Sequence, residues 1–162
     1  MRIAPQLMTY ADSLGGDLAA LESLLDGPLE GLFGGLHILP PFPSSGDRGF
    51  APMTYEEIEP AFGSWADIER LAVRRDILLD VMINHVSRRS PAFEDFLKFG
   101  RQSRFADLFI TIDKVWPNGD PPPDDVAKIF LRKPEAPFST VTISSTRDQE
   151  RIWTSFGTKD WY

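Results

Sequence analysis

The sequence contains no cysteine among its 162 residues. A disulfide framework, a thiolate metal site and a cysteine nucleophile are therefore excluded. The chain also lacks a run of about 18 apolar residues, the length that a membrane-spanning helix needs. Its first residues do not show the charged segment followed by an apolar core that marks a secretory signal. We therefore expect a cytoplasmic protein with no membrane partner.

Positive charge is also scarce. The chain has 17 Lys and Arg against 24 Asp and Glu, for a net charge of −7, and its basic residues form no cluster longer than Arg88-Arg89. This balance argues against nucleic acid as a partner, because nucleic-acid-binding surfaces are basic. The hydrophobic share of 42% is enough for a globular domain with a core of its own.

The first half of the chain alternates strand-like and helix-like segments. We expect strands over residues 3–10, 31–39 and 77–84. One helix is predicted by a leucine stripe that Gly27-Pro28 ends, with members Leu18, Leu21, Leu24 and Leu25. A second helix is predicted by the capping box at Ser64 and Asp67, with core positions Ile68, Leu71 and Ala72. This alternation is typical of an α/β fold with a parallel sheet.

The composition changes after residue 86. We expect a helix that begins at Ser90-Pro91 and ends at Gly100, followed by strands over 107–112, 138–143 and 151–156. We therefore divide the chain into residues 1–86 and a smaller unit of residues 87–162. Residues 40–62 form a loop, and a loop that follows a parallel strand is a common place for binding residues.

Three polar residues mark the end of the third predicted strand. The run Asp80-Val-Met-Ile-Asn-His brings Asp80, Asn84 and His85 to the carboxyl end of an apolar segment. Parallel strands present their functional residues at that end. We expect Asp80 to be buried, and a buried carboxylate needs a cationic or hydrogen-bonding partner. His37 also ends a strand, but its apolar neighbours favour a structural role.

Several motifs resemble one known family. The Asp80–His85 run resembles the first signature of glycoside hydrolase family 13, the α-amylase superfamily. Four further runs resemble its sucrose phosphorylase branch in their order and spacing. They are Gln6-Leu-Met-Thr-Tyr-Ala-Asp-Ser-Leu-Gly, His37-Ile-Leu-Pro-Pro-Phe, Gly46-Asp-Arg-Gly-Phe and Trp116-Pro-Asn-Gly. The resemblance implies the first three strands of a (β/α)8 TIM barrel, with a small α+β domain inserted after strand three. Since such a barrel needs about 250 residues, it also implies an amino-terminal fragment.

The resemblance also implies residue roles. Asp47, Phe50 and His85 would bind the glucosyl ring, and Phe156 would line the pocket where the acceptor enters. Asp80 and Asn84 would support the site. The two catalytic carboxyl groups of a retaining enzyme would lie beyond Tyr162, so that no catalytic residue is expected in this chain. The resemblance implies neither a metal ion nor another cofactor.

The implied function is that of an α-glucoside phosphorylase. Sucrose, glucosylglycerol or glucosylglycerate would react with inorganic phosphate by double displacement to give α-glucose 1-phosphate, and the fragment alone would be inactive. Two alternatives stay open: an α-glucosidase of the same family, and a non-catalytic remnant that binds sugar or a partner chain. Without the carboxyl-terminal part of the barrel, the unpaired sheet edges predict self-association.

Overall fold

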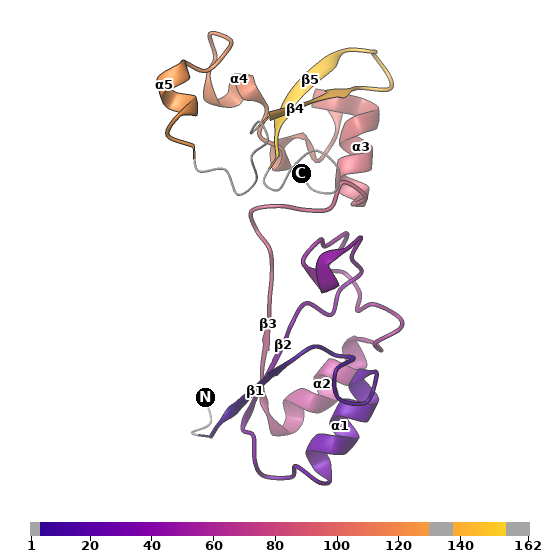
Figure 1. The fold of residues 1–162 in the computed structure, drawn as a ribbon. Helices are drawn as coiled ribbons and strands as arrows, with labels where there is room; N and C mark the ends of the chain where they lie inside the picture. The colour runs from indigo at the N-terminus through magenta and orange to yellow at the C-terminus, as the bar shows by residue number, and fades with distance from the viewer. Residues whose placement is uncertain (1–3, 130–137, 155–162) are drawn as a thin grey trace. The chain divides into compact units, whose positions relative to one another are not determined.

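The structure is a computed structural model that describes residues 4–129 and 138–154. The chain divides into two compact units, Met1–Met82 and Ile83–Tyr162 (Figure 1). Each is described by itself below. Among the described residues, no helix combines the length and the apolar character that crossing a membrane requires.

The first unit is a three-stranded parallel sheet with two helices. In chain order its elements are β1 (Gln6–Thr9), α1 (Leu18–Asp26), β2 (Gly35–Ile38), α2 (Trp65–Arg74) and β3 (Asp76–Leu79), with the short 3-10 helix η1 (Asp47–Gly49) in the loop after β2. The strand order is β1-β2-β3, and Leu36 of β2 lies opposite Leu7 and Ile77. The α/β class and the parallel sheet predicted from the sequence are confirmed.

Both helices begin at the predicted capping signals. The Asp17 carboxylate accepts a hydrogen bond from the Ala20 amide at 2.7 Å, and Ser64 and Asp67 form the capping box of α2. The helices pack on one face of the sheet, where the core consists of Ala11, Leu18, Leu21, Leu25, Leu36, Ile38, Phe42, Ile58, Ile68 and Leu71. Ala72 was predicted to be in this core and is exposed instead, although it lies one helical turn after Ile68, so the buried stripe of α2 ends at Leu71.

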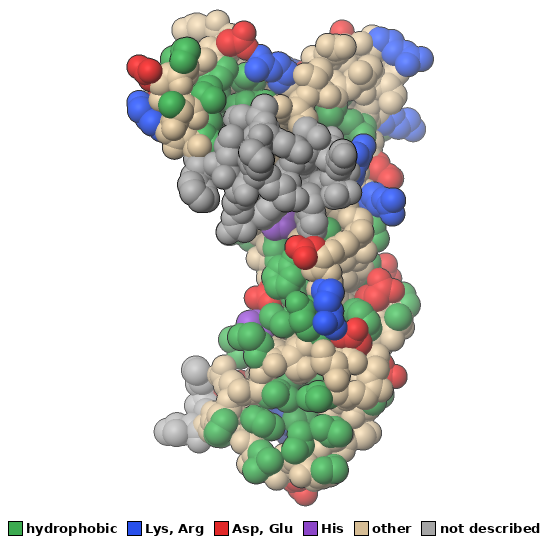
Figure 2. Space-filling model, viewed as in Figure 1, with side chains coloured by type: hydrophobic (Ala, Val, Ile, Leu, Met, Phe, Trp, Pro, Cys, Tyr) green, Lys and Arg blue, Asp and Glu red, His purple; other side chains and the backbone are tan. Residues whose placement is uncertain are grey.

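The other face of the sheet carries Met8, His37 and Leu78, which lie side by side across the three strands. Met8 is 63% exposed and Leu78 is 42% exposed. Since successive side chains of a strand point to opposite faces, these residues point away from α1 and α2. Hydrophobic side chains are also visible at the surface of this unit in Figure 2. This second face of the sheet is therefore partly exposed within the first unit.

The third strand is shorter than predicted. Residues 77–84 were expected to be a strand, but β3 ends at Leu79, whose partner Ile38 is the last residue of β2. Beyond this point the backbone of Met82 is bound by a side chain instead. The Tyr55 hydroxyl donates to the Met82 carbonyl at 3.1 Å and accepts from its amide at 2.9 Å. Burial raises the pKa of Tyr55, which keeps the hydroxyl protonated and able to donate.

The second unit is built around a phenylalanine cluster. Its elements are α3 (Pro91–Phe99), the 3-10 helices η2 (Gly100–Gln102) and η3 (Ala106–Leu108), α4 (Ile112–Val115), α5 (Pro123–Val126), β4 (Phe138–Thr142) and β5 (Gln149–Trp153). The strands β4 and β5 form an antiparallel pair. The core consists of Phe93, Phe96, Phe109, Val141, Ile143 and Ile152. The predicted helix from Ser90-Pro91 is confirmed, with the Ser90 hydroxyl accepting from the Phe93 amide at 3.2 Å.

One predicted strand of this unit is wrong. Residues 107–112 fall on η3, a short connection and the start of α4. Only one bridge forms there, between Thr111 and Ile152, with the Trp153 amide donating to the Ile110 carbonyl at 2.8 Å. The segment alternates polar and apolar residues as a strand does. It nevertheless pairs with β5 only through Thr111, between the helical turns η3 and α4.

Candidate functional site

Polar side chains follow all three strands of the first unit at their carboxyl ends. Tyr10 and Asp12 follow β1, the long loop of residues 40–62 follows β2, and Asp80 follows β3. This edge is where parallel sheets carry binding residues. The candidate site is therefore built from this edge of the first unit.

The loop after β2 is held closed at its base by Ser44. The Ser44 hydroxyl lies 2.7 Å from the Gly46 carbonyl and 2.9 Å from the Ala51 carbonyl, and the Ala51 amide lies 3.2 Å from the same hydroxyl. A bridge between Ser44 and Pro52 closes the loop. These contacts leave residues 46–50 as a short tip.

The tip has a left-handed backbone at three successive residues. Asp47, Arg48 and Gly49 have φ values of 53°, 48° and 98°. Asp tolerates this conformation, but for Arg it costs about 1–2 kcal/mol. Gly49 is required, because a Cβ atom there would lie 2.2 Å from the Pro40 carbonyl oxygen. A strained backbone of this kind persists only where its surroundings hold it in place.

The two residues of this loop that were predicted to bind sugar are arranged differently. Asp47 is exposed, and among the described residues its carboxylate has no hydrogen-bond or ionic partner. Phe50 is half-buried, and its amide donates to the Asp47 carbonyl at 3.1 Å. A carboxylate and an aromatic ring joined by one turn are the two kinds of group that a sugar ring contacts. Their role in sugar binding stays a prediction.

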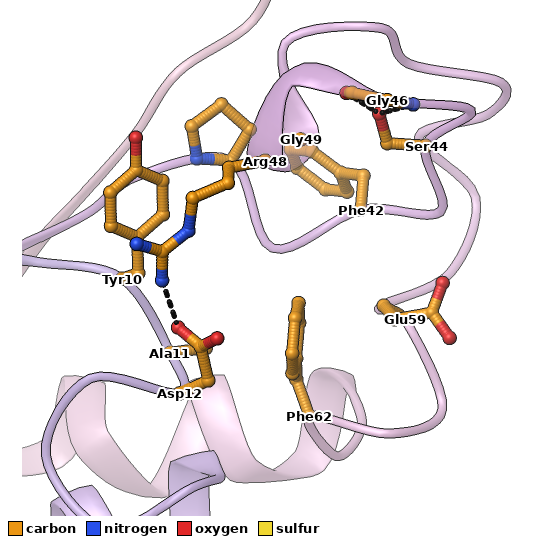
Figure 3. Close-up of a pocket in the computed structure, with 11 residues that line it drawn as sticks. Tyr10, Ala11, Asp12, Phe42, Ser44, Gly46, Arg48, Gly49, Glu59 and Phe62 are labelled. Atoms are coloured by element: carbon orange, nitrogen blue, oxygen red, sulfur yellow. Dashed lines mark hydrogen bonds and ion pairs between the residues drawn. The ribbon is translucent and has the colours of Figure 1, made fainter.

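Arg48 joins this tip to the turn after β1. Its Nη2 lies 2.7 Å from Asp12 Oδ1, and its Cζ lies 3.9 Å from the centre of the Tyr10 ring. Beside this pair is a cavity of about 280 Å³ whose lining includes Phe42 and Phe62. Figure 3 shows Arg48 and Asp12 on one side of the cavity and Glu59 on the other. The cavity is thus lined by both aromatic and charged side chains.

Asp80 pairs with a residue that the sequence did not single out for function. His37 Nε2 lies 3.2 Å from Asp80 Oδ1, with 21% of the histidine and 31% of the aspartate side chain exposed. Asp80 is therefore half-buried, because it lies just beyond the end of β3. The side chain within ion-pair distance of Asp80 is that of His37, which the apolar neighbours had assigned to a structural role.

Asn84 and His85 belong to the second unit. His85 Nδ1 lies 3.1 Å from Asn84 Oδ1. The two side chains thus lie within hydrogen-bond distance, with the amide oxygen able only to accept. Phe156, the fourth residue predicted to bind substrate, lies outside the described residues. The structure therefore joins Asp47 with Phe50 and Asn84 with His85, as two separate pairs.

Sequence reasoning missed Tyr10, Asp12 and His37 as parts of this edge. The signal was available, since both lie in the first motif, with Tyr10 at the end of a predicted strand and Asp12 just after it. Within residues 4–129 and 138–154, no group of three or more His, Asp or Glu side chains is arranged to hold a metal ion.

Comparison with curated proteins finds three phosphorylases among the relatives, although no family model matches the chain. A sucrose 6F-phosphate phosphorylase from Thermoanaerobacterium thermosaccharolyticum is 58% identical over 96% of this chain. A glucosylglycerol phosphorylase from Marinobacter adhaerens is 43% identical over 96%, and a sucrose phosphorylase from Streptococcus mutans is 41% identical over 93%. The chain spans 31–32% of the length of these relatives.

Solved structures give the same result for the fold. The crystal structure of a sucrose 6F-phosphate phosphorylase from Thermoanaerobacter thermosaccharolyticum matches 99% of this chain and 32% of its own, with a TM-score of 0.90 and 56% identity. A family GH13_31 enzyme matches 97% of this chain with a TM-score of 0.71 at 20% identity, a level that supports the fold alone. Over nearly its whole length the chain is therefore similar to phosphorylases named for sucrose 6F-phosphate, glucosylglycerol and sucrose, and it spans about a third of the length of these relatives.

Proposed function

We propose that this chain is part of a retaining α-glucoside phosphorylase. The observation that carries the proposal is the 41–58% identity to three phosphorylases over 93–96% of the chain. These relatives are phosphorylases by name, which favours phosphorolysis over the α-glucosidase alternative. The non-catalytic alternative receives no specific support.

The sequence identities of the relatives suggest which substrate to test first. The sucrose 6F-phosphate phosphorylase is 58% identical, whereas the glucosylglycerol and sucrose phosphorylases are 43% and 41% identical. We therefore place a phosphorylated sucrose first among the α-glucosides to be tested. Sucrose, glucosylglycerol and glucosylglycerate follow. Inorganic phosphate is the second substrate.

We propose that the first unit supplies the first three strands of a (β/α)8 barrel and that the second unit is a small α+β domain inserted after strand three. The parallel order β1-β2-β3, with helices on one face only, supports the first part. In a closed barrel, Met8, His37 and Leu78 would face the barrel interior. The assignment of residues 1–86 and 87–162 to these two domains is part of the same proposal.

The proposed residue roles are those that the resemblance to the family implies. Asp47 and Phe50 bind the glucosyl ring through its hydroxyls and its C–H face, and His85 adds a hydrogen bond. Phe156 lines the acceptor side, while Asp80 and Asn84 support the site. The nucleophile and the acid/base are two carboxyl groups about 5 Å apart that the longer protein supplies. The nucleophile displaces the leaving group to form a glucosyl-enzyme, and phosphate attacks this intermediate to release α-glucose 1-phosphate.

The 162-residue chain by itself is expected to be inactive and to self-associate. Within the described sheet, the outer strands β1 and β3 each pair along one edge, to β2, and their other edge is open. An open strand edge can pair with another chain. A cytoplasmic location, with neither nucleic acid nor membrane as a partner, stays a prediction.

The test is an assay of the longer protein that contains this chain. Each α-glucoside is incubated with inorganic phosphate, and α-glucose 1-phosphate is measured against free glucose. Glucose 1-phosphate from at least one substrate, with phosphorylated sucrose giving the highest kcat/KM, is the expected result. Free glucose at the same rate with and without phosphate would show a hydrolase, and no product from any substrate would reject the enzyme proposal.

A further inference from the structure

We infer that Arg48 is a positioning residue, whose clamp onto Asp12 and Tyr10 holds the loop tip so that the Asp47 carboxylate meets the sugar. This inference rests on the proposed function, because it assigns Asp47 to the sugar. It concerns a contact between two loops of the first unit, residues 10–12 and 46–50.

The first step is the backbone of the tip. Asp47 and Arg48 both have positive φ, and Gly49 is fixed against Pro40. Because this conformation is unfavourable for Arg, the tip needs an interaction that pulls it into place. The contacts of Ser44 hold the base of the loop at Gly46 and Ala51, on either side of the three left-handed residues.

The second step is the Arg48 side chain, which spans the gap to the turn after β1. The guanidinium donates to Asp12 Oδ1 at 2.7 Å and lies over the Tyr10 ring at 3.9 Å (Figure 3). An ion pair fixes one point, and a planar group stacked on a ring fixes an orientation as well. The two contacts together restrain a residue whose neighbour is Asp47.

The third step is the division of roles between neighbours. Arg48 points to Asp12 and Tyr10, whereas Asp47 has no partner among the described residues and is exposed. Arg48 therefore acts on a ligand through Asp47. Since the Arg48 side chain is 57% exposed and that of Asp12 is 39% exposed, the pair contributes little to global stability. Its effect should appear in binding and catalysis rather than in the unfolding midpoint.

The experiment compares Arg48→Ala, Arg48→Lys, Asp12→Asn and Asp47→Ala with the double variant Asp47→Ala/Arg48→Ala in the longer protein. We expect Arg48→Ala to lower kcat/KM for the glucoside about tenfold or more, because misplacing a binding group by a fraction of an ångström is costly. Arg48→Lys should fall between, since an ammonium keeps the ion pair but not the stacked plane. In the Asp47→Ala background, Arg48→Ala should change kcat/KM by less than about twofold.

A matched control is Arg104→Ala, which removes an exposed arginine that lies 4.5 Å over the Phe105 ring in the second unit. This variant should retain the wild-type kcat/KM. Wild-type kinetics for both Arg48→Ala and Asp12→Asn would overturn the inference. An equal loss for Arg48→Ala with and without Asp47 would also overturn it, because Arg48 would then contact the substrate itself.

Amide hydrogen exchange separates this inference from the proposed function. Loss of the clamp should speed exchange in residues 46–50 of Arg48→Ala while the exchange in β4 and β5 stays unchanged. If the wild-type protein acts on no glucoside, the proposed function fails, and the exchange measurement still tests the clamp. Unchanged exchange in residues 46–50 would overturn it.

Discussion

The two units reach order by different means. The first is a parallel sheet joined by crossover helices, and its hydrophobic core lies on one face of that sheet. The second packs its phenylalanine cluster between the helix α3 and the antiparallel pair of β4 and β5. The first unit thus leaves hydrophobic residues of one sheet face, Met8 and Leu78, exposed, whereas Phe93 and Phe96 of the second are fully buried.

The two units also differ in where their ion pairs lie. In the second unit Arg101 joins three elements, since it binds Glu150 at 2.7 and 3.1 Å and Asp113 at 2.7 Å. These two carboxylates raise the pKa of Arg101. In the first unit the ion pairs made by arginine lie around α1, α2 and the loop tip. The open face carries His37 and Asp80, one polar pair between apolar neighbours.

The largest effect should come from the core of the second unit. Phe96 is fully buried, and its ring centre lies 5.0 Å from that of Phe109. Phe96→Ala should lower the free energy of unfolding by about 3–5 kcal/mol. The matched control is Phe99→Ala in the same helix, a residue 40% exposed, which should cost about 1 kcal/mol or less. Chemical denaturation measures both, and similar losses would break the comparison.

The open face of the first unit gives the second prediction. Leu36 is fully buried under the helices, and Leu36→Ala should cost about 2–5 kcal/mol wherever the chain is measured. Met8 lies on the other face and is 63% exposed. In the 162-residue chain Met8→Ala should cost about 0.5 kcal/mol or less, and in the longer protein a few kcal/mol. Equal costs in the two proteins would contradict a barrel that covers this face.

A smaller effect should separate two neighbouring arginines of the first unit. The Arg75 guanidinium is 6% exposed and donates to the Leu25 carbonyl at 2.8 Å and to Asp26 at 2.5 Å. Its hydrogen bond is the main cause that lowers the pKa of Asp26. Arg75→Ala leaves a buried carbonyl without its donor and should cost about 1–3 kcal/mol.

Arg74 is the control for that variant. It is 56% exposed and lies 3.5 Å from Asp26, so Arg74→Ala should change stability by about 0.5 kcal/mol or less. Denaturant midpoints of the two variants give the answer. If Arg74→Ala were as costly as Arg75→Ala, the burial of the Arg75 bonds would not be the reason for their contribution.

Sequence patterns predicted the elements whose signals are local. Three such signals are confirmed, and each lies within the helix that it predicts or at its first residues. They are the leucine stripe of α1, the Ser64 capping box of α2 and the Ser90-Pro91 start of α3. The end of β3 was wrong, because it depends on where β2 ends and on the Tyr55 hydroxyl. Strand length in a sheet is set by partners, which a single segment does not reveal.

The candidate site shows the same division. The strand-end position of Asp80 was readable, and its family motif marked it as a site residue. Its partner His37 was not readable, since the contact joins β2 to the residue after β3. The clamp from Arg48 to Asp12 spans 36 positions and depends on three left-handed residues that sequence alone does not indicate. The positions of the loops could thus be predicted from the sequence, whereas the contacts between them could not.

The smallest effect concerns acid stability of the second unit. The pKa of Asp113 is lowered to about 2, first by a hydrogen bond from the Thr111 side chain and then by Arg101. Because the folded pKa lies below the unfolded value of 3.8, the contribution of Asp113 is fully present above about pH 4 and is lost as the pH falls through about 2. The Asp113 side chain is 40% exposed, so solvent screening keeps this contribution to about 1 kcal/mol or less.

The measurement is the stability difference between the wild type and Asp113→Asn at several pH values. Asp113→Asn should be less stable at pH 5, and the two curves should converge as the pH falls to about 2. Asp107→Asn is the control for the loss of one charge, since Asp107 is fully exposed and paired with Lys114 at 3.1 Å. A constant difference for Asp113→Asn would mean that the ionised carboxylate is not what stabilises the start of α4. The Arg101 network would then fix its elements through Glu150 alone, and the second unit would depend less on charge than the comparison holds.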